Sequence, residues 1–218
     1  MNGKSHLVLL RTAVSFLALV AASPAFACGN GKLLFEEKFA AIPAWIAASP
    51  EKSVGPNGLT IAESAGDTTW YQGPPEPFGN AEFCVTVSAQ ASGSDLASAG
   101  IAFRGFNADN YYRVAVNNIS GEFNVIRRQA GQWIVIIPDA ASPAIRKGPT
   151  AENEVSVKMS GIHALISVND TPVAELNAPA AFVNDKRQNY VNVIWISYPS
   201  TKPSYTFIFK NFQVREAQ

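Results

Sequence analysis

The segment from Ala99 to Ile137 limits most strongly what this chain can fold into, because it reads as four consecutive β-strands. Apolar side chains occupy every second position from 99 to 103 and again from 112 to 116. A period of two is that of a strand with one buried face. Short runs of Asn, Asp, Gly and Gln separate the four segments, as in an antiparallel meander. The sequence therefore predicts an all-β protein.

Strand-like segments continue on both sides of this meander, and no segment shows a helical period. Many short strands punctuated by Gly and Pro are typical of a two-sheet antiparallel sandwich or jelly roll. We expect Trp45 to anchor a loop that follows the first strand. The further strands predicted are 33–39, 59–61, 69–72, 81–90, 154–160, 162–169, 173–176, 190–198 and 205–214, with a loop over 138–149.

Two of these segments form a predicted hairpin with one apolar side. Gly161 provides the tight turn between its strands, and Asn169-Asp170 forms the next turn, where polar residues that tolerate left-handed backbone are needed. The side chains expected to face the core are Val155, Val157, Met159, Ile162, Ala164, Ile166 and Val168.

The amino terminus has the pattern of a signal peptide. Basic residues, an apolar run over 13–22 and small residues before Cys28 predict cleavage after Ala27. The apolar run is about half of the roughly 20 residues that a transmembrane helix needs. We therefore expect a signal peptide over 1–27 and a single exported domain, periplasmic or extracellular, over 28–218.

The two cysteines, Cys28 and Cys84, leave two interpretations open. In an oxidising compartment they would pair, and a disulfide that closes a loop of about 55 residues stabilises a fold by roughly 4 kcal/mol. Cys28 also follows the expected cleavage site, as a lipid-bearing cysteine does in bacterial lipoproteins. Bulky Phe26 fits the lipoprotein pattern poorly, so we favour the disulfide.

The charge of the chain argues against two classes of partner. The 17 basic and 17 acidic residues balance, and removal of Lys4 and Arg11 with the signal leaves a net charge near −2. Nucleic acid and anionic lipid would both call for a basic stripe. The nearest feature is the pair Arg127-Arg128, so we expect neither partner.

Four segments together resemble the concanavalin A-like lectin/glucanase jelly rolls, in particular laminin-G-like and 3-keto-disaccharide-hydrolase-like domains. The resemblance spans nearly all of residues 28–218 and implies a jelly roll with a sugar-binding sheet, while its motifs are patterns of strand and turn. The segments are LLFEEKF with Trp45 downstream, AGIAFRGFNADNYYRVAV, NEVSVKMSGIHALISVNDTPV and FIFKNFQVRE.

Few of the side chains that remain after removal of the signal peptide belong to recognisable catalytic motifs. His163 is the one histidine left after the signal is removed, and we expect it on the protein surface. There is no GxSxG motif to present a nucleophilic serine, and the E-x-D-x-x-E pattern of jelly-roll glucanases is missing. If the protein cleaves glycosides, Glu122 or Asp109 is the candidate acid.

A candidate binding face lies opposite the core side of the meander. Aromatic rings stack on sugar C–H faces while Arg, Asn and Asp side chains take the hydroxyls, a pattern found in many sugar sites. Trp70 and Tyr71 form a second, weaker aromatic option. The candidate ligand-binding residues are Arg104, Tyr111, Arg113, Asn117, Trp133, Asn192 and Tyr198.

The remaining polar motifs fit simple structural explanations. The Asn107–Asn110 segment could supply oxygens to calcium, but the same residues are common turn formers, so we expect no cofactor. Asn118-Ile119-Ser120 matches a glycosylation sequon. The leading hypothesis is an exported, disulfide-bonded jelly roll that binds a carbohydrate, such as a cell-envelope glycan, or a related polar ligand without cleaving it. The alternatives are a glycoside-cleaving enzyme and a passive envelope or interaction domain.

Overall fold

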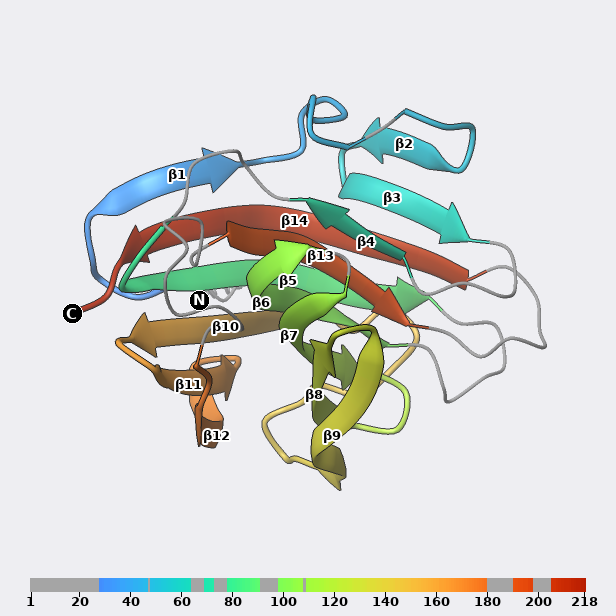
Figure 1. Ribbon diagram of the computed structural model, residues 1–218. Coiled ribbons are helices and arrows are strands. Elements are labelled where there is room, and N and C mark those ends of the chain that lie inside the picture. The colour runs from blue at the N-terminus through green and yellow to red at the C-terminus, as the bar shows by residue number, and fades with distance from the viewer. Residues whose placement is uncertain are drawn as a thin grey trace, which may run out of the picture.

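Two antiparallel sheets pack face to face in the computed structural model of this protein (Figure 1). The structure describes residues 28–46, 48–63, 69–72, 78–90, 98–107, 109–179, 190–197 and 205–218. These residues form strands and turns without a helix, which confirms the predicted all-β jelly-roll sandwich. The signal peptide predicted over 1–27 lies outside the described residues.

The eight-stranded sheet has the order β12-β11-β10-β5-β14-β3-β2, and β1 also pairs with β14. Strand β14 therefore has three partners, and it runs through the middle of this sheet in Figure 1. The strands are β1 (Leu33–Glu37), β2 (Lys52–Gly55), β3 (Gly58–Glu63), β5 (Ala81–Gln90), β10 (Asn153–Ser160), β11 (His163–Val168), β12 (Thr171–Asn177) and β14 (Tyr205–Glu216).

The six-stranded sheet has the order β4-β13-β6-β7-β8-β9 and contains the predicted meander as four neighbouring strands. The last meander strand runs to Ala141, so it extends into the loop that the sequence predicted over 138–149. The strands are β4 (Thr69–Gln72), β6 (Ser98–Asn107), β7 (Asn110–Asn117), β8 (Glu122–Gln129), β9 (Gln132–Ala141) and β13 (Tyr190–Ser197).

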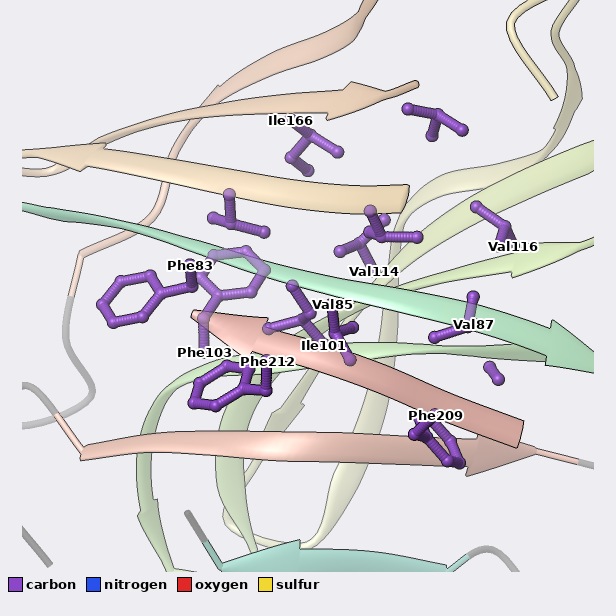
Figure 2. Close-up of a cluster of buried hydrophobic side chains, with 14 of the residues drawn as sticks. Phe83, Val85, Val87, Ile101, Phe103, Val114, Val116, Ile166, Phe209 and Phe212 are labelled. Carbon is purple, nitrogen blue, oxygen red and sulfur yellow. The ribbon is translucent and has the colours of Figure 1, made fainter. Parts of the chain in front are cut away.

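The hydrophobic core lies between the two sheets and is built from the alternate side chains that face inward. Aromatic and β-branched residues from β5, β6, β7, β11 and β14 meet there (Figure 2). The rings of Phe103 and Tyr112 stack 5.6 Å apart within it. Trp45 packs edge-on against Phe39 at 6.3 Å, which confirms its predicted role as a loop anchor.

The β10–β11 hairpin has the predicted register. Val155 lies opposite Val168, and both are fully buried. Asn169 and Asp170 have φ values of 49° and 63°, the left-handed backbone expected of that turn. The prediction for Ile162 is wrong, because this residue sits in the Gly161 turn and is 50% exposed.

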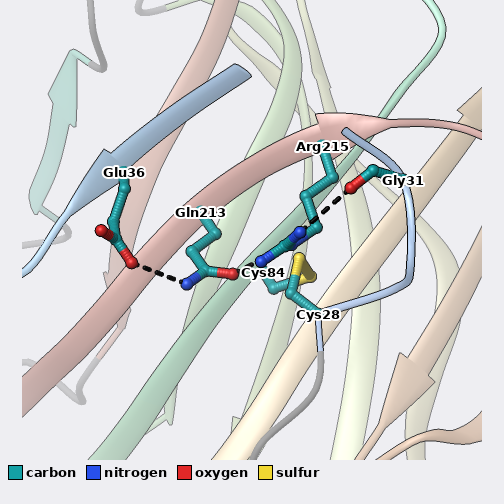
Figure 3. Close-up of a disulfide and its surroundings, with 6 residues drawn as sticks. All are labelled: Cys28, Gly31, Glu36, Cys84, Gln213 and Arg215. Atoms are coloured by element: carbon teal, nitrogen blue, oxygen red, sulfur yellow. Dashed lines mark hydrogen bonds between the residues drawn. A yellow bond between two sulfur atoms is a disulfide. The ribbon is translucent and has the colours of Figure 1, made fainter. Parts of the chain in front are cut away.

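The Cys28–Cys84 disulfide predicted from the sequence is present, with a Cα–Cα distance of 5.6 Å (Figure 3). A hydrogen-bonded row lies beside it: Gln213 Nε2 donates to Glu36 Oε1 at 2.9 Å, and Arg215 Nη1 donates to the Gly31 carbonyl at 3.0 Å. The bond occupies the Cys28 sulfur that lipid attachment would require, so it is incompatible with the lipoprotein alternative.

Buried asparagines connect the loops to the sheets. Asn118 is 2% exposed, and its side chain bonds both the N–H and the carbonyl of Ala89 as well as the carbonyl of Gly148. Asn169 similarly donates to the carbonyl of Ala144 and to Asn153 Oδ1, each at 2.8 Å. The sequon at Asn118 is therefore a structural tie, since its amide faces the protein interior.

Candidate functional site

The outer face of the six-stranded sheet carries a small cluster that is separate from the main core. Strand alternation turns Tyr112 and Val114 toward the eight-stranded sheet and turns Tyr111 and Arg113 the other way. Tyr111 packs there with Ala102 and Ala115. The predicted orientation of Tyr111 and Arg113 away from the inter-sheet core is therefore what the structure shows.

Trp133 lies on β9, at the edge of this face, and is 46% exposed. Its ring meets Tyr111 edge-on, with 6.1 Å between centroids and an interplanar angle of 85°. Two guanidinium groups lie against the same ring, Arg128 at 4.7 Å and Arg113 at 5.9 Å from its centroid. Such cation–π contacts hold an aromatic ring in one orientation.

A row of hydrogen-bonded polar groups runs across β7, β8 and β9 and contacts the Trp133 ring through Arg113. Arg113 Nη1 donates to Asn124 Oδ1 at 3.0 Å, and Asn124 Nδ2 donates to Asp139 Oδ1 at 2.6 Å. These bonds fix which way the Asn124 amide points. We name the set Arg113, Asn124, Asp139 and Trp133 the meander site.

Burial changes the acid–base properties of the residues beneath the tryptophan. Tyr111 and Arg113 are 2% and 5% exposed. Loss of water raises the pKa of Tyr111 to about 12 and lowers the pKa of Arg113 to about 10. The phenol therefore stays neutral and the guanidinium stays charged at neutral pH. Both side chains can support Trp133 from below, but neither presents an open face to a ligand.

The turn before β7 uses the oxygens that could have held calcium. Asn107 Oδ1 accepts from the Asp109 N–H and from Asn110 Nδ2, each at 2.9 Å. Asp109 Oδ1 pairs with Arg128 Nη2 at 3.2 Å. In the part of the chain that the structure describes, no three His, Cys, Asp or Glu side chains group to hold a metal ion.

Two residues that were predicted to line the binding face, Arg104 and Asn117, have structural contacts elsewhere. Arg104 lies at a break in the β6–β7 register with φ of 53°, and its Nη2 donates to the Gly161 carbonyl of the opposite sheet. Its expected place beside Tyr111 is therefore wrong, because the irregularity breaks the alternation. Asn117 Oδ1 accepts from the N–H groups of Ile119 and Ser120, so this residue caps the turn after β7.

The other predicted positions are only partly described. Asn192 is paired with Ala102 on the neighbouring strand, which places its backbone beside the meander site. The side chains of Asn192, Trp70 and Tyr71 are outside the described part of the structure, as is all of Tyr198. Sequence reasoning missed Asn124, Arg128 and Asp139, which become visible once β8 and β9 are aligned beside β7.

The two candidate acids are far apart. Asp109 precedes Asn110, the first residue of β7, whereas Glu122 pairs with Asn117 at the other end of that strand. Seven residues of antiparallel strand span about 24 Å. The carboxyls of a glycosidase lie about 5 to 10 Å apart across the bond that breaks, so these two cannot form one catalytic pair.

His163 is exposed at the start of β11, as predicted. It lies opposite Ser160 in the eight-stranded sheet, away from the meander site. Within the described residues, no helix is long and apolar enough to span a membrane.

Solved structures with this fold cover most of the chain, although neither a protein-family model nor a curated protein sequence matches it. The carbohydrate-binding module CBM66 from Bacillus subtilis has a TM-score of 0.55 and 11% identity over 85% of this chain and 97% of that one. The catalytic domain of an endo-1,3-β-glucanase (laminarinase) from Thermotoga petrophila has a TM-score of 0.59 and 10% identity, over 87% and 99%.

A third match is the Crh5 transglycosylase in complex with NAG, with a TM-score of 0.54 and 14% identity over 87% of each chain. All three confirm the antiparallel jelly-roll fold that the sequence pattern predicts. At identities this low, the likeness defines the fold and leaves the activity to be argued from the site.

Proposed function

We propose that this protein is an exported carbohydrate-binding module that holds a neutral glycan on the outer face of β7, β8 and β9 without cleaving it. The observation that carries the proposal is an exposed Trp133 whose ring contacts Arg113, the first member of the hydrogen-bonded row Arg113–Asn124–Asp139. A flat aromatic surface next to oriented polar groups is the arrangement with which proteins bind sugars.

The residues in and around the meander site divide into two roles. Trp133 stacks on one sugar ring, while Asn124 and Asp139, which lie further along the row, bond hydroxyls of neighbouring sugars. Tyr111, Arg113 and Arg128 hold the tryptophan in place. Asp139 on this face balances the positive charge of Arg113, and Asp109 pairs with Arg128. A neutral sugar therefore fits this face better than an anionic one.

Two general observations support the carbohydrate class and the compartment. CBM66 is a carbohydrate-binding module by name, and the laminarinase and the transglycosylase act on glycans. The disulfide is typical of an oxidising compartment outside the cytosol.

Binding of Trp133→Ala to glycans tests the proposal. We expect at least a fivefold larger dissociation constant in affinity electrophoresis through gels that contain laminarin, soluble chitin fragments or mucin, because stacking contributes about 1 kcal/mol or more. The matched control is Ile162→Ala, which removes an exposed apolar side chain from the opposite sheet. If Trp133→Ala is retarded as strongly as the wild type in every gel that retards the wild type, the proposed site is wrong. If the wild type binds no glycan on a broad glycan array, the proposed function is wrong.

A glycoside hydrolase is the second candidate, favoured by one pair of carboxyls. Glu122 and Asp139 are on the same face of β8 and β9, because Glu122 lies two residues from the Asn124 to which Asp139 bonds. Diagonal neighbours of this kind are about 7 to 8 Å apart. Release of reducing ends that is lost in both Glu122→Gln and Asp139→Asn supports hydrolysis, and a stable polysaccharide incubated with the wild type contradicts it.

A further inference from the structure

The exposed part of the outer face of the six-stranded sheet is narrow. All eight residues of β7 are buried, including the outward-pointing Tyr111 and Arg113. The exposed and half-buried outward side chains are on β8 and β9, where this sheet ends. Two strands are about 10 Å wide, whereas β9 is ten residues long. A ligand on this surface therefore has more room along the strands than across them.

Three kinds of side chain follow one another along these two strands. Aromatic Trp133 is at one end. The middle is apolar, because Val135 is 60% exposed and lies opposite Ile126. The other end is polar, since Asn124 Nδ2 donates to Asp139 Oδ1 at 2.6 Å. Each of the five side chains shares the outward face of β7 through its contacts or its cross-strand pairing. We name these five residues the β8–β9 strip.

The length of the β8–β9 strip matches a short chain of sugars. Arg113 Cζ is 5.9 Å from the Trp133 centroid, and its Nη1 is 3.0 Å from Asn124 Oδ1. With the Cζ–Nη1 bond included, Asn124 Oδ1 is at most about 10 Å from that centroid, and Asp139 lies up to about 5 Å further along. One pyranose unit with its linking oxygen extends about 5 Å, given bonds of about 1.5 Å. The strip therefore has room for about three consecutive units.

The backbone gives a similar separation between the two ends. Arg128 lies opposite Trp133, and Asn124 is four residues away from it on β8. Four residues of antiparallel strand extend about 14 Å. The aromatic end and the polar end are therefore too far apart for a single sugar ring to contact both.

The polar end of the strip mainly offers hydrogen-bond acceptors. Asn124 uses one N–H on Asp139 and one oxygen lone pair on Arg113. An amide has two N–H bonds and two lone pairs, and a carboxylate has about four acceptor sites. The two side chains can therefore accept about four more hydrogen bonds and donate one. Hydroxyl groups fit this end as donors, whereas sulfated or carboxylated sugars would be repelled by Asp139.

We propose that the β8–β9 strip binds three consecutive units of a linear neutral glycan whose chain lies lengthwise along the two strands. This inference rests on the proposed function and adds to it the direction and the minimum length of the bound chain. One unit stacks on Trp133, the next lies on Val135 and Ile126 within reach of Asn124, and the third donates its hydroxyls to Asp139. A fragment of two units can reach only one end of the strip.

Binding of oligosaccharides of defined length tests this proposal. The probes are laminari-oligosaccharides and chito-oligosaccharides of two to six units, measured by isothermal titration calorimetry. We expect the dissociation constant of the wild type to fall at least fivefold between two and four units, because the longer chain adds hydrogen bonds to a carboxylate. From four to six units it should change less than twofold, since the strip is then filled.

Two variants separate the contributions of the two ends. Asp139→Ala should lose the gain between two and four units and should bind the two-unit fragment like the wild type. Trp133→Ala should weaken the binding of both lengths by the same factor. The matched control is Glu175→Ala, which removes an exposed carboxylate from β12 of the other sheet and should keep the wild-type dependence on length.

Failure of this inference is distinguishable from failure of the proposed function. A wild type that binds two-unit and four-unit fragments equally well overturns the three-unit strip and leaves glycan binding in place. The same holds if Asp139→Ala keeps the whole gain, or if neither series of fragments binds while another glycan on the array does. A wild type that binds no fragment and no glycan on the array overturns both proposals.

Discussion

Glu154 is an acid in a place that disfavours its charge. It is 6% exposed on β10, and its backbone N–H is held by Asn169 Oδ1 at 3.0 Å. Burial raises the pKa of Glu154 to about 7, with help from the negative charges of Asp170 and Glu82, while Arg146 acts in the opposite direction. The folded protein therefore keeps a proton on this carboxyl at a pH where an unfolded chain has lost it.

This raised pKa predicts that stability falls as pH rises. Between the unfolded value of 4.5 and the folded value of about 7, the folded state binds more protons, so unfolding becomes easier with each pH unit. The loss should reach about 1 to 2 kcal/mol by pH 8, or several degrees in Tm. Thermal unfolding at pH 5 and pH 8 measures it.

Glu154→Gln should reduce this pH dependence, because glutamine stays neutral at both values. Glu175→Gln, which changes an exposed carboxylate on β12, is the control and should keep the wild-type slope. Identical slopes in all three proteins would show that Glu154 ionises normally.

At the residue scale, the sequence predicted which way a side chain points better than it predicted the neighbours of that side chain. Alternation along β7 correctly turned Tyr111 and Arg113 away from the core, since a strand period is a local property. It could not show that both are buried under Trp133, because that depends on β9 lying two strands away. Arg104 was misplaced because a left-handed residue interrupts its strand, and arginine is not a residue type that indicates such an interruption.

At the element scale, the Cys28–Cys84 bond ties the segment before β1 to β5 in the middle of a sheet. The bond spans 56 residues and lowers the conformational entropy of the unfolded chain, whereas the folded chain is already ordered. The disulfide therefore stabilises the folded state by about 4 kcal/mol. Cys28→Ser combined with Cys84→Ser should lower the free energy of unfolding in urea by about that amount.

The control for this prediction is a reducing agent. It should destabilise the wild type to the level of the double variant and leave the double variant unchanged. A loss below about 1 kcal/mol would show that the hydrogen bonds to β14 hold this segment in place without the disulfide.

Most strands could be predicted as elements because their alternating pattern is continuous over several residues. The exception is β2, where Lys-Ser-Val-Gly offers four residues and one large apolar side chain. Its position comes from pairing with β3, which places Val54 opposite Leu59. Ile162 fits the alternation of β11 in sequence, but the backbone of Gly161, with φ of 58°, turns it outward.

At the scale of the whole molecule, strand order is the part of the architecture that the sequence could not supply. The meander was predictable because its strands are neighbours along the chain, whereas β5 lies between β10 and β14, and β13 lies between β4 and β6. Such pairings depend on contacts between distant segments, for which one sequence carries no local pattern.

The central position of β14 determines when this protein can fold. A ribosome produces this strand after the thirteen other described strands, and until Tyr205–Glu216 emerges, β1 and β3 have no connection to β5 within the described sheet. The strands of the larger sheet are then in three separate groups, and its aromatic side chains Phe207, Phe209 and Phe212 have not yet been supplied. A nascent chain that lacks β14 therefore cannot close the eight-stranded sheet.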